Sequence, residues 1–197
     1  MPGASAGGNV PASLPATMNS KTFLLSACCL LFTIATQADE VTTTIQQEAR
    51  RCAQSLMAGN YPAILEYTHD RVIEKNGGKE KMQNALELGI AGMKARGMKL
   101  LDAKIGDAQP PVKVGTWLVS VVPQTVVLQV RDSKVTQASH LFGISGDGGK
   151  TWKFIDVGPL NEERLYGLFP ELKGKVPLPP KSEPAVEKMP APAPAAQ

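Results

Sequence analysis

Residues 141–155 have the sequence LFGISGDGGKTWKFI, in which apolar residues alternate on both sides of a run of glycine and aspartate. Alternation with a period of two is typical of a strand with one buried face. A short polar, glycine-rich run between two such strands favours a tight reversal of the chain. The stretch therefore predicts a β-hairpin, and the chain is interpreted outward from it.

The centre of this hairpin has the spacing Ser145-x-Asp147-x-Gly149-x-Thr151-Trp152. The spacing resembles the Asp-box of sialidases and related propellers, in which the aspartate and hydroxyls bind the backbone of their own turn and the tryptophan packs beneath. A propeller needs several blades of about 40 residues each, and the motif occurs once here. The resemblance implies a structural turn, not a sialidase.

The register of the hairpin suggests a candidate site. If Ser145 pairs with Thr151 across a five-residue loop, alternate residues of the two strands share one concave, core-facing side. The expected pairs are Ile144 with Trp152, Phe142 with Phe154, and His140 with Asp156. A histidine and a carboxylate at the end of an apolar pocket are candidate catalytic residues for acid–base chemistry. The alternative is a hydrogen-bonded polar pair at the rim.

Helical periodicity dominates the chain before residue 98. A helix over Val41 to Ala58 is expected to end at Gly59-Asn60, and Tyr61-Pro62 begins a second short helix. The longest helix is expected from Lys79 to Arg96. The positions expected to face inward are Ile45, Ala49, Cys52, Ala53 and Leu56 in the first helix and Met82, Leu86, Ile90 (or Gly89) and Met93 in the last.

From Met98 onward the period is two, which predicts a half made of strands. Turns are expected at Pro110-Pro111, Pro123-Gln124 and Asp132-Ser133, giving an antiparallel meander that curls over the helices. The expected strands are those around Leu101 to Ile105, Val112 to Val122, Thr125 to Val130, Ser139 to Ser145 and Thr151 to Asp156, followed by an amphipathic segment over Leu160 to Phe169. The fold class is thus α+β, with N-terminal helices packed on a curved antiparallel sheet.

Residues 39–172, the expected domain, resemble the nuclear-transport-factor-two-like, or cystatin-like cone, superfamily. The resemblance is carried by Gly59-Asn60-Tyr61…Tyr67-Thr68-His69, by Gly78-Lys79-Glu80-Lys81-Met82 at the start of the longest helix, and by the final paired strands. In detail the chain looks like small secreted bacterial members of unassigned activity. The superfamily includes isomerase-like and dehydratase-like enzymes, ligand carriers and dimerisation modules, so the resemblance implies a fold and no single function.

The ends of the chain have their own compositions. Residues 1–17 predict a disordered or untranslated leader, and residues 173–197, rich in proline and alanine, a disordered tail. Residues 18–38 resemble a secretory signal, with Lys21 before the apolar run Phe23 to Ala35 and cleavage after Ala38, which predicts a periplasmic or secreted protein. The alternatives are a membrane anchor, for which the run is short, and lipidation at Cys28.

Composition excludes several kinds of partner. The formal net charge is +3 with acids and bases interspersed, so nucleic acid is not expected. After signal removal Cys52 is the remaining cysteine, expected as buried filler, and no metal or cofactor is predicted. A homodimer is expected, because one of two sets of strand residues, Trp117, Val119 and Val121 or Leu118 and Val122, would face outward.

Aromatic residues near the expected pocket are the candidate ligand-binding residues: Tyr61, Tyr67, His69, Trp117, Phe142, Trp152 and Phe154. The alternatives are a helix cap for His69 and ordinary packing for Trp117. The sequence favours an exported non-catalytic module that binds a small apolar or amphipathic molecule or a protein. Its alternative is a small isomerase or dehydratase that uses the His140 and Asp156 pair, with His69 or a tyrosine as proton donor.

Overall fold

The computed structural model describes the backbone of residues 20–189 and the side chains of residues 39–189. The expected leader, 1–17, and the end of the expected tail, 190–197, lie outside the described residues, as do the side chains of the signal segment. The chain divides into two units, of which residues 37–197 form the larger. The elements are α1 (Ser20–Ala58), α2 (Tyr61–Tyr67), α3 (Asp70–Lys75), α4 (Lys79–Ala95), β1 (Met98–Ile105), β2 (Val112–Val114), β3 (Trp117–Val130), β4 (Ser133–Ser145), β5 (Lys153–Asp156), α5 (Glu162–Leu168), η1 (Pro170–Leu172) and β6 (Ala185–Lys188).

Local chemistry sets where the helices end, and the expected C-terminal ends of α1 and α4 are confirmed, whereas α1 begins at Ser20 and not at Val41. The chain leaves α1 through Gly59 at φ +66°, a left-handed conformation that favours glycine. The side chain of Asn60 then accepts a hydrogen bond from the amide of Ala63 (3.2 Å), which caps α2. Gly97, at φ +72°, follows α4 in the same way. The short helix α3 was not expected, and it begins where His69 caps it.

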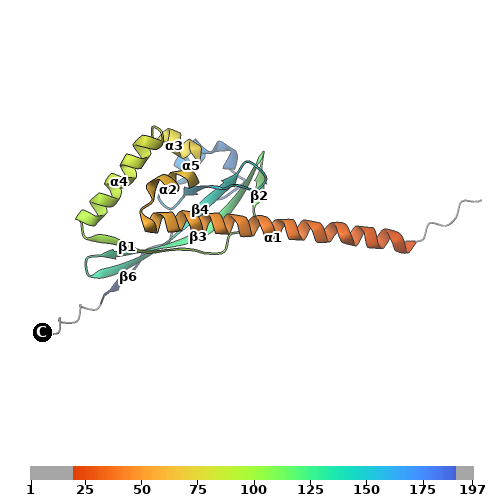
Figure 1. Cartoon of the computed structure of the whole chain (residues 1–197), viewed down its shortest axis with the longest axis horizontal. Coiled ribbons are helices and arrows are strands. Elements are labelled where there is room, and N and C mark those ends of the chain that lie inside the picture. The colour runs from red at the N-terminus through yellow and green to blue at the C-terminus, as the bar shows by residue number, and fades with distance from the viewer. Residues whose placement is uncertain (1–19, 190–197) are drawn as a thin grey trace, which may run out of the picture. The chain divides into compact units, whose positions relative to one another are not determined.

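The strands form one curled antiparallel sheet, a half-barrel in the order β1-β3-β4-β5, with β2 paired to β3 and β6 paired to β4. Figure 1 shows the part of α1 after residue 37 lying along this sheet and α4 standing off it, joined to the sheet at β1. The expected α+β class, with helices before a curved antiparallel sheet, is confirmed.

Strand β3 corrects two expectations. The expected strand from Val112 to Val122 is broken at Gly115 (φ +62°) into β2 and β3. The turn expected at Pro123-Gln124 is absent, because β3 continues through Pro123, which pairs with His140 of β4. The carbonyl of Pro123 accepts from the amide of Gly106 beyond the end of β1 (2.8 Å), so its nitrogen also faces β1. No hydrogen bond to β4 is lost, and a proline is tolerated inside the sheet.

The hairpin register was predicted wrongly by one residue. Ile144 pairs with Lys153, Phe142 with Ile155 and Leu141 with Asp156. Because side chains alternate between faces, this shift separates residues that were expected together. One face carries Phe142, Ile144 and Ile155, and the other carries Leu141, Trp152 and Phe154. The sheet is consequently covered on both sides.

Each face has its own core. Ile45 and Ala49 of α1 pack on the face of Leu141, Trp152 and Phe154. The other face is covered by Leu165 of α5, by Phe169, by η1 and by the segment that follows it. The core residues on that second face are Val114, Val119, Val121, Phe142, Ile144, Ile155, Val157, Leu165, Phe169, Leu172 and Val176.

The segment after residue 172 is therefore part of the domain, which corrects the expected tail boundary. Val176 is buried, and its carbonyl accepts a hydrogen bond from the hydroxyl of Tyr166 (3.2 Å). Further on, β6 pairs with β4 from Ala185 to Lys188. Proline-rich composition did not prevent packing, because single apolar side chains between the prolines reach the core.

The surface argument for a dimer is also corrected. Val119 and Val122, one from each set of strand residues expected to face outward, are fully buried within the chain. Trp117 is half-buried against the second core. The homodimer stays a prediction, without this apolar sheet face to support it.

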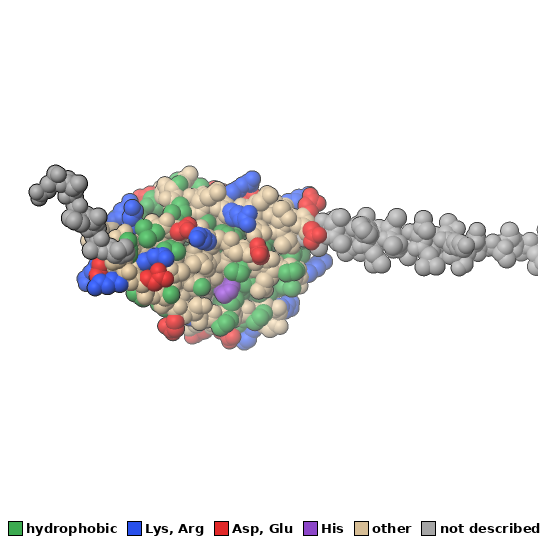
Figure 2. Space-filling view, turned by 90° about the horizontal axis from the view of Figure 1, so that it is seen from below, with side chains coloured by type: hydrophobic (Ala, Val, Ile, Leu, Met, Phe, Trp, Pro, Cys, Tyr) green, Lys and Arg blue, Asp and Glu red, His purple; other side chains and the backbone are tan. Residues whose placement is uncertain are grey.

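The exposed surface of the described residues is mixed in charge. Figure 2 shows one face on which acidic and basic side chains are interspersed with apolar ones, and no patch of a single sign dominates it. Among the described residues, no helix has the length and hydropathy needed to cross a membrane.

Candidate functional site

Helix α4 borders the main hollow of the structure. Its inward side chains, Met82, Leu86, Ile90 and Met93, are half-buried, and no residue of α4 is fully buried. The helix contacts α2, α3 and β1, and it does not rest on the middle of the sheet. An apolar stripe that faces inward without full burial marks a space beneath the helix.

The larger cavity in this space has a volume of about 880 Å³. It lies between α4, the end of α1, the short helix α2 and the face of the sheet that α1 covers. Its walls are mostly apolar, which is typical of sites for small molecules. They include Cys52, Ala53 and Leu56 of α1, Ile64 and Tyr67 of α2, Met82 and Leu86 of α4, and Ala103, Leu141 and Phe154 of the sheet.

Few polar groups line the larger cavity near the sheet. They are the thiol of Cys52, the hydroxyl of Tyr67, the amide of Gln124 and the carboxylate of Asp156. Away from the sheet the lining also includes polar and charged residues of the neighbouring helices and turns: Thr68, Lys75, Asn76, Glu163 and Arg164. Burial, together with the negative charge of Asp156, raises the pKa of the Cys52 thiol to about 11. A thiol with this pKa is protonated at neutral pH and is a weak nucleophile. The pKa of Tyr67 is raised as well, first by desolvation and then by Glu48.

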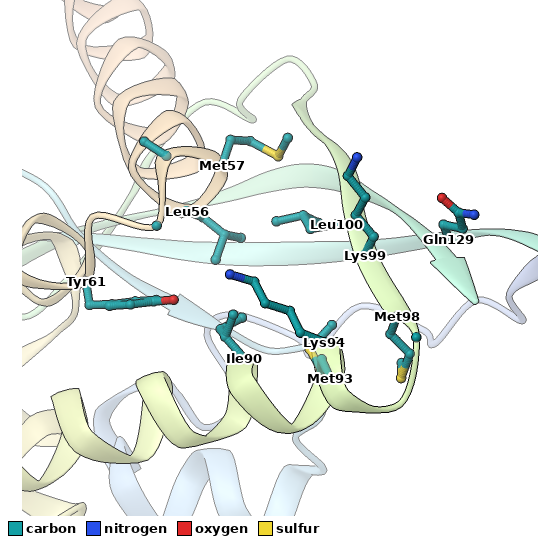
Figure 3. Close-up of a pocket in the computed structure, with 13 residues that line it drawn as sticks. Leu56, Met57, Tyr61, Ile90, Met93, Lys94, Met98, Lys99, Leu100 and Gln129 are labelled. Carbon is teal, nitrogen blue, oxygen red and sulfur yellow. The ribbon is translucent and has the colours of Figure 1, made fainter. Parts of the chain in front are cut away.

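A second cavity, of about 630 Å³, lies beside the first and shares Leu56 with it. Figure 3 shows Tyr61 of α2, Ile90, Met93 and Lys94 of α4, and Leu100 of β1 arranged around it. Both cavities follow the inward face of α4, the first along Met82 and Leu86 and the second along Ile90 and Met93. The sequence pattern predicted that these side chains face the core, and it did not indicate that they line two cavities.

The proposed catalytic pair is not assembled. Asp156 pairs with Leu141, so the side chains of His140 and Asp156 leave the sheet on opposite faces. The carboxylate of Asp156 accepts hydrogen bonds from the hydroxyl of Ser139 (3.1 Å) and the amide of Gly158 (2.9 Å). Both His140 and Asp156 border a smaller cavity of about 330 Å³ at the edge of β4, without a hydrogen bond between them. The one-residue error in register accounts for this correction.

His69 lies at the start of α3, where its Nδ1 accepts from the amide of Arg71 (3.2 Å). The ring packs edge-on against Phe169 (4.8 Å between centroids) and Trp117 (5.9 Å). Burial lowers the pKa of His69 even though Asp70 opposes the shift. His69 and Trp117 line none of the three cavities described above. The geometry of His69 is that of a helix cap, the alternative to ligand binding.

Arg71 completes this cluster. Its guanidinium lies over the rings of Trp117 (4.9 Å) and Phe169 (5.5 Å) and binds both carboxylate oxygens of Glu171 (2.8 and 2.9 Å). This pairing lowers the pKa of Glu171 to about 2. The cluster attaches α3 to η1 through stacked and bidentate contacts. Its role is to hold the C-terminal elements on the second core.

The remaining expected ligand-binding residues form two groups, one that lines a cavity and one that is buried in the cores. Tyr61 lines the second cavity, and Tyr67 and Phe154 line the larger one. Phe142 and Trp152 are fully buried in the two cores.

The predicted structural turn is confirmed. Asp147 accepts hydrogen bonds from the amide of Lys150 (3.1 Å), the amide (3.0 Å) and hydroxyl (2.7 Å) of Thr151, and the hydroxyl of Ser145 (2.8 Å). The hydroxyl of Ser145 in turn accepts from the amide of Gly149 (2.9 Å). The bonds from Thr151 hold the pKa of Asp147 well below its usual range. These groups are occupied by their own turn.

Among the described residues, no three His, Cys, Asp or Glu side chains gather closely enough to hold a metal ion. Comparison with family models, with curated proteins and with solved structures found no match for this chain.

Proposed function

We propose that this protein binds a small apolar or amphipathic molecule in the larger cavity between α4 and the sheet. The observation that carries the proposal is that cavity itself: about 880 Å³, walled largely by apolar side chains from five helices and the sheet. Its volume lies in the range of sites for drug-sized ligands, which is roughly 300–1,000 Å³.

The apolar stripe of α4 supports the same proposal. Removing apolar surface from water contributes about 25 cal/mol per Å², and Met82 and Leu86 leave much of that contribution unused in the free protein. A ligand in the cavity would cover both side chains. The helix is attached mainly through α2, α3 and β1, so it can adjust to an occupant without disturbing either core.

The state of the polar groups near the sheet favours binding over chemistry. Cys52 carries a thiol with a raised pKa, and Asp156 is held by Ser139 and Gly158. Acid–base catalysis by His140 and Asp156 has no supporting geometry, because the two side chains lie on opposite faces. The alternative of an isomerase or dehydratase is therefore not proposed.

Membership of the cone superfamily and export are part of the proposal. The order of helices and strands and the curled sheet support the first. Lys21 and the apolar run after it support the second. Intact-mass measurement of the protein recovered from cells tests export, with a mature chain beginning at Asp39 as the expected result; a chain that retains residues 18–38 would contradict it.

A titration with the neutral fluorescent reporter N-phenylnaphthylamine tests the binding proposal. Ala103 of β1 lines the cavity, so Ala103→Phe should fill part of it and weaken reporter binding about tenfold or more. Ala138→Phe is the matched control, because Ala138 is an exposed strand residue outside this cavity. Equal reporter binding by both variants, or no binding by the wild type, would refute the proposal.

A further inference from the structure

Lys94 continues the inward face of α4. It lies four residues after Ile90, which itself lies four residues after Leu86, and residues at this spacing share one face of a helix. Figure 3 shows the Lys94 side chain extending across the second cavity, with its ammonium group pointing toward Leu56 and the hydroxyl of Tyr61. Lys94 is an exposed residue in the last turn of α4, so its charge borders both the cavity and the solvent.

The Lys94 ammonium group has no counter-charge in the described part of the chain. The ion pairs there join other residues, and Lys94 forms none. The residues that line the second cavity include Lys94 and Lys99 and no aspartate or glutamate. The cavity therefore has a positive end, and it is complementary to an anion.

A hydroxyl group stands near this positive end. The Tyr61 hydroxyl reaches back to the turn after α1, where a Cβ placed on Gly59 would lie 3.8 Å from it. In the residues the structure describes, it makes no hydrogen bond to another group. Figure 3 shows it directed into the cavity from α2, with Lys94 approaching from α4.

The rest of the second cavity is apolar. Leu56, Ile90, Met93, Met98 and Leu100 form its walls. From Met93 back to Met82, the inward stripe of α4 extends over about 17 Å at 1.5 Å per residue. This stripe passes from the positive end to the larger cavity, which suits an elongated chain with one charged end.

We propose that the ligand is a single-chain carboxylate amphiphile of the fatty-acid type. Its carboxylate binds the Lys94 ammonium and the Tyr61 hydroxyl, and its chain follows α4 past Leu56 toward the larger cavity. An ammonium and a hydroxyl supply one donor for each carboxylate oxygen. This inference rests on the proposed binding function and adds the charge and the orientation of the ligand.

Three probes with the same chain and different ends test it: dodecanoate, dodecanol and dodecylammonium, each displacing N-phenylnaphthylamine. The wild type should bind dodecanoate about tenfold more tightly than dodecanol, and dodecylammonium most weakly. Lys94→Gln should remove the difference between dodecanoate and dodecanol, and Lys94→Glu should reverse the preference toward dodecylammonium. Lys81→Gln is the matched control, because Lys81 is an exposed lysine of the same helix that lines none of the three cavities.

The outcomes separate the two proposals. If all three probes bind equally, the cavity binds apolar chains and the carboxylate inference is overturned. If Lys94→Gln and Lys81→Gln weaken dodecanoate binding equally, general surface charge explains the effect and the assignment of Lys94 is overturned. If the wild type binds the reporter but none of the three probes displaces it, the inference alone fails; if the wild type does not bind the reporter, the proposed function fails with it. Melting curves of each variant confirm that it is folded under the conditions of the titration.

Discussion

Asp147→Ala should lower the stability of the protein and leave ligand binding unchanged. The carboxylate accepts four hydrogen bonds, two from backbone amides and two from the hydroxyls of Ser145 and Thr151. Together they close the turn between β4 and β5. No atom of this turn lines the larger cavity or the second cavity, so its loss should not reach either one.

The size of the effect follows from these four bonds. A typical net contribution is about 0.5–1.5 kcal/mol for each hydrogen bond. The turn is exposed, so water can replace part of what is lost, and each bond counts near the lower end of this range. The expected decrease in the free energy of unfolding is about 2 kcal/mol, or a decrease in Tm of about 4–8 °C for a domain of this size.

The pH dependence of the free energy of unfolding tests the same hydrogen bonds of Asp147 independently. The pKa of Asp147 is lowered in the folded protein, chiefly by hydrogen bonds from Thr151. The ionised carboxylate therefore stabilises the fold above its unfolded pKa of about 4, and this contribution is lost as the pH falls toward the folded value. The difference in stability between wild type and Asp147→Ala should shrink below about pH 4.

Urea unfolding and reporter titration of the same samples provide the test. Lys150→Ala is the control, since it removes a side chain from the same turn and leaves the carboxylate and its partners in place. A wild-type unfolding curve for Asp147→Ala would refute the structural argument. Lost reporter binding with a wild-type unfolding curve would instead place function in the turn.

Two further predictions concern the packing of α1 and α3. A Cβ on Gly143 would lie 2.5 Å from Cδ1 of Ile45, so Gly143→Ala should destabilise the protein by about 1–3 kcal/mol. Ile45→Val removes that Cδ1 atom, so adding it to Gly143→Ala should recover part of the loss. If urea unfolding shows that the losses of the two substitutions simply add, the contact is contradicted. Burial lowers the pKa of His69 in the folded state, so on acidification the unfolded state takes up a proton at a higher pH than the folded state does. The free energy of unfolding should therefore fall as the pH decreases below about 6.5. His69→Asn keeps a capping side chain without the titration and should flatten the pH dependence of stability between about pH 5 and 6.5; an unchanged slope would contradict this assignment.

Much of the local structure could be predicted because its causes are local. Gly59 ends α1 since the left-handed conformation favours glycine, and Asn60 caps the helix that follows. The hydroxyls and carboxylate of the turn from Ser145 to Thr151 satisfy backbone groups within a few residues. The change of period from helical to alternating at Met98 marks the start of the sheet.

The candidate site could be predicted only in part. Tyr61, Tyr67 and Phe154 were identified because aromatic side chains near a pocket usually line it. Lys94 was missed, although its spacing from Leu86 and Ile90 places it on the inward face. A lysine at the end of a helix is ordinarily solvated, and the hollow beneath α4 has no signature in the sequence.

Long-range relations were decided by the tertiary structure alone. The hairpin register differs by one residue from the expected one, and this separated His140 from Asp156, because a period of two sends every shifted side chain to the other face. Pro123 remains in β3 because its nitrogen faces the end of β1, which no local pattern reveals. The sequence by itself determined the ends of the helices at Gly59 and Gly97 and the turn from Ser145 to Thr151, since capping and turn hydrogen bonds span a few residues. Which faces are covered, and what space is left between them, depends on contacts between elements distant along the chain, and only the folded structure specifies those contacts.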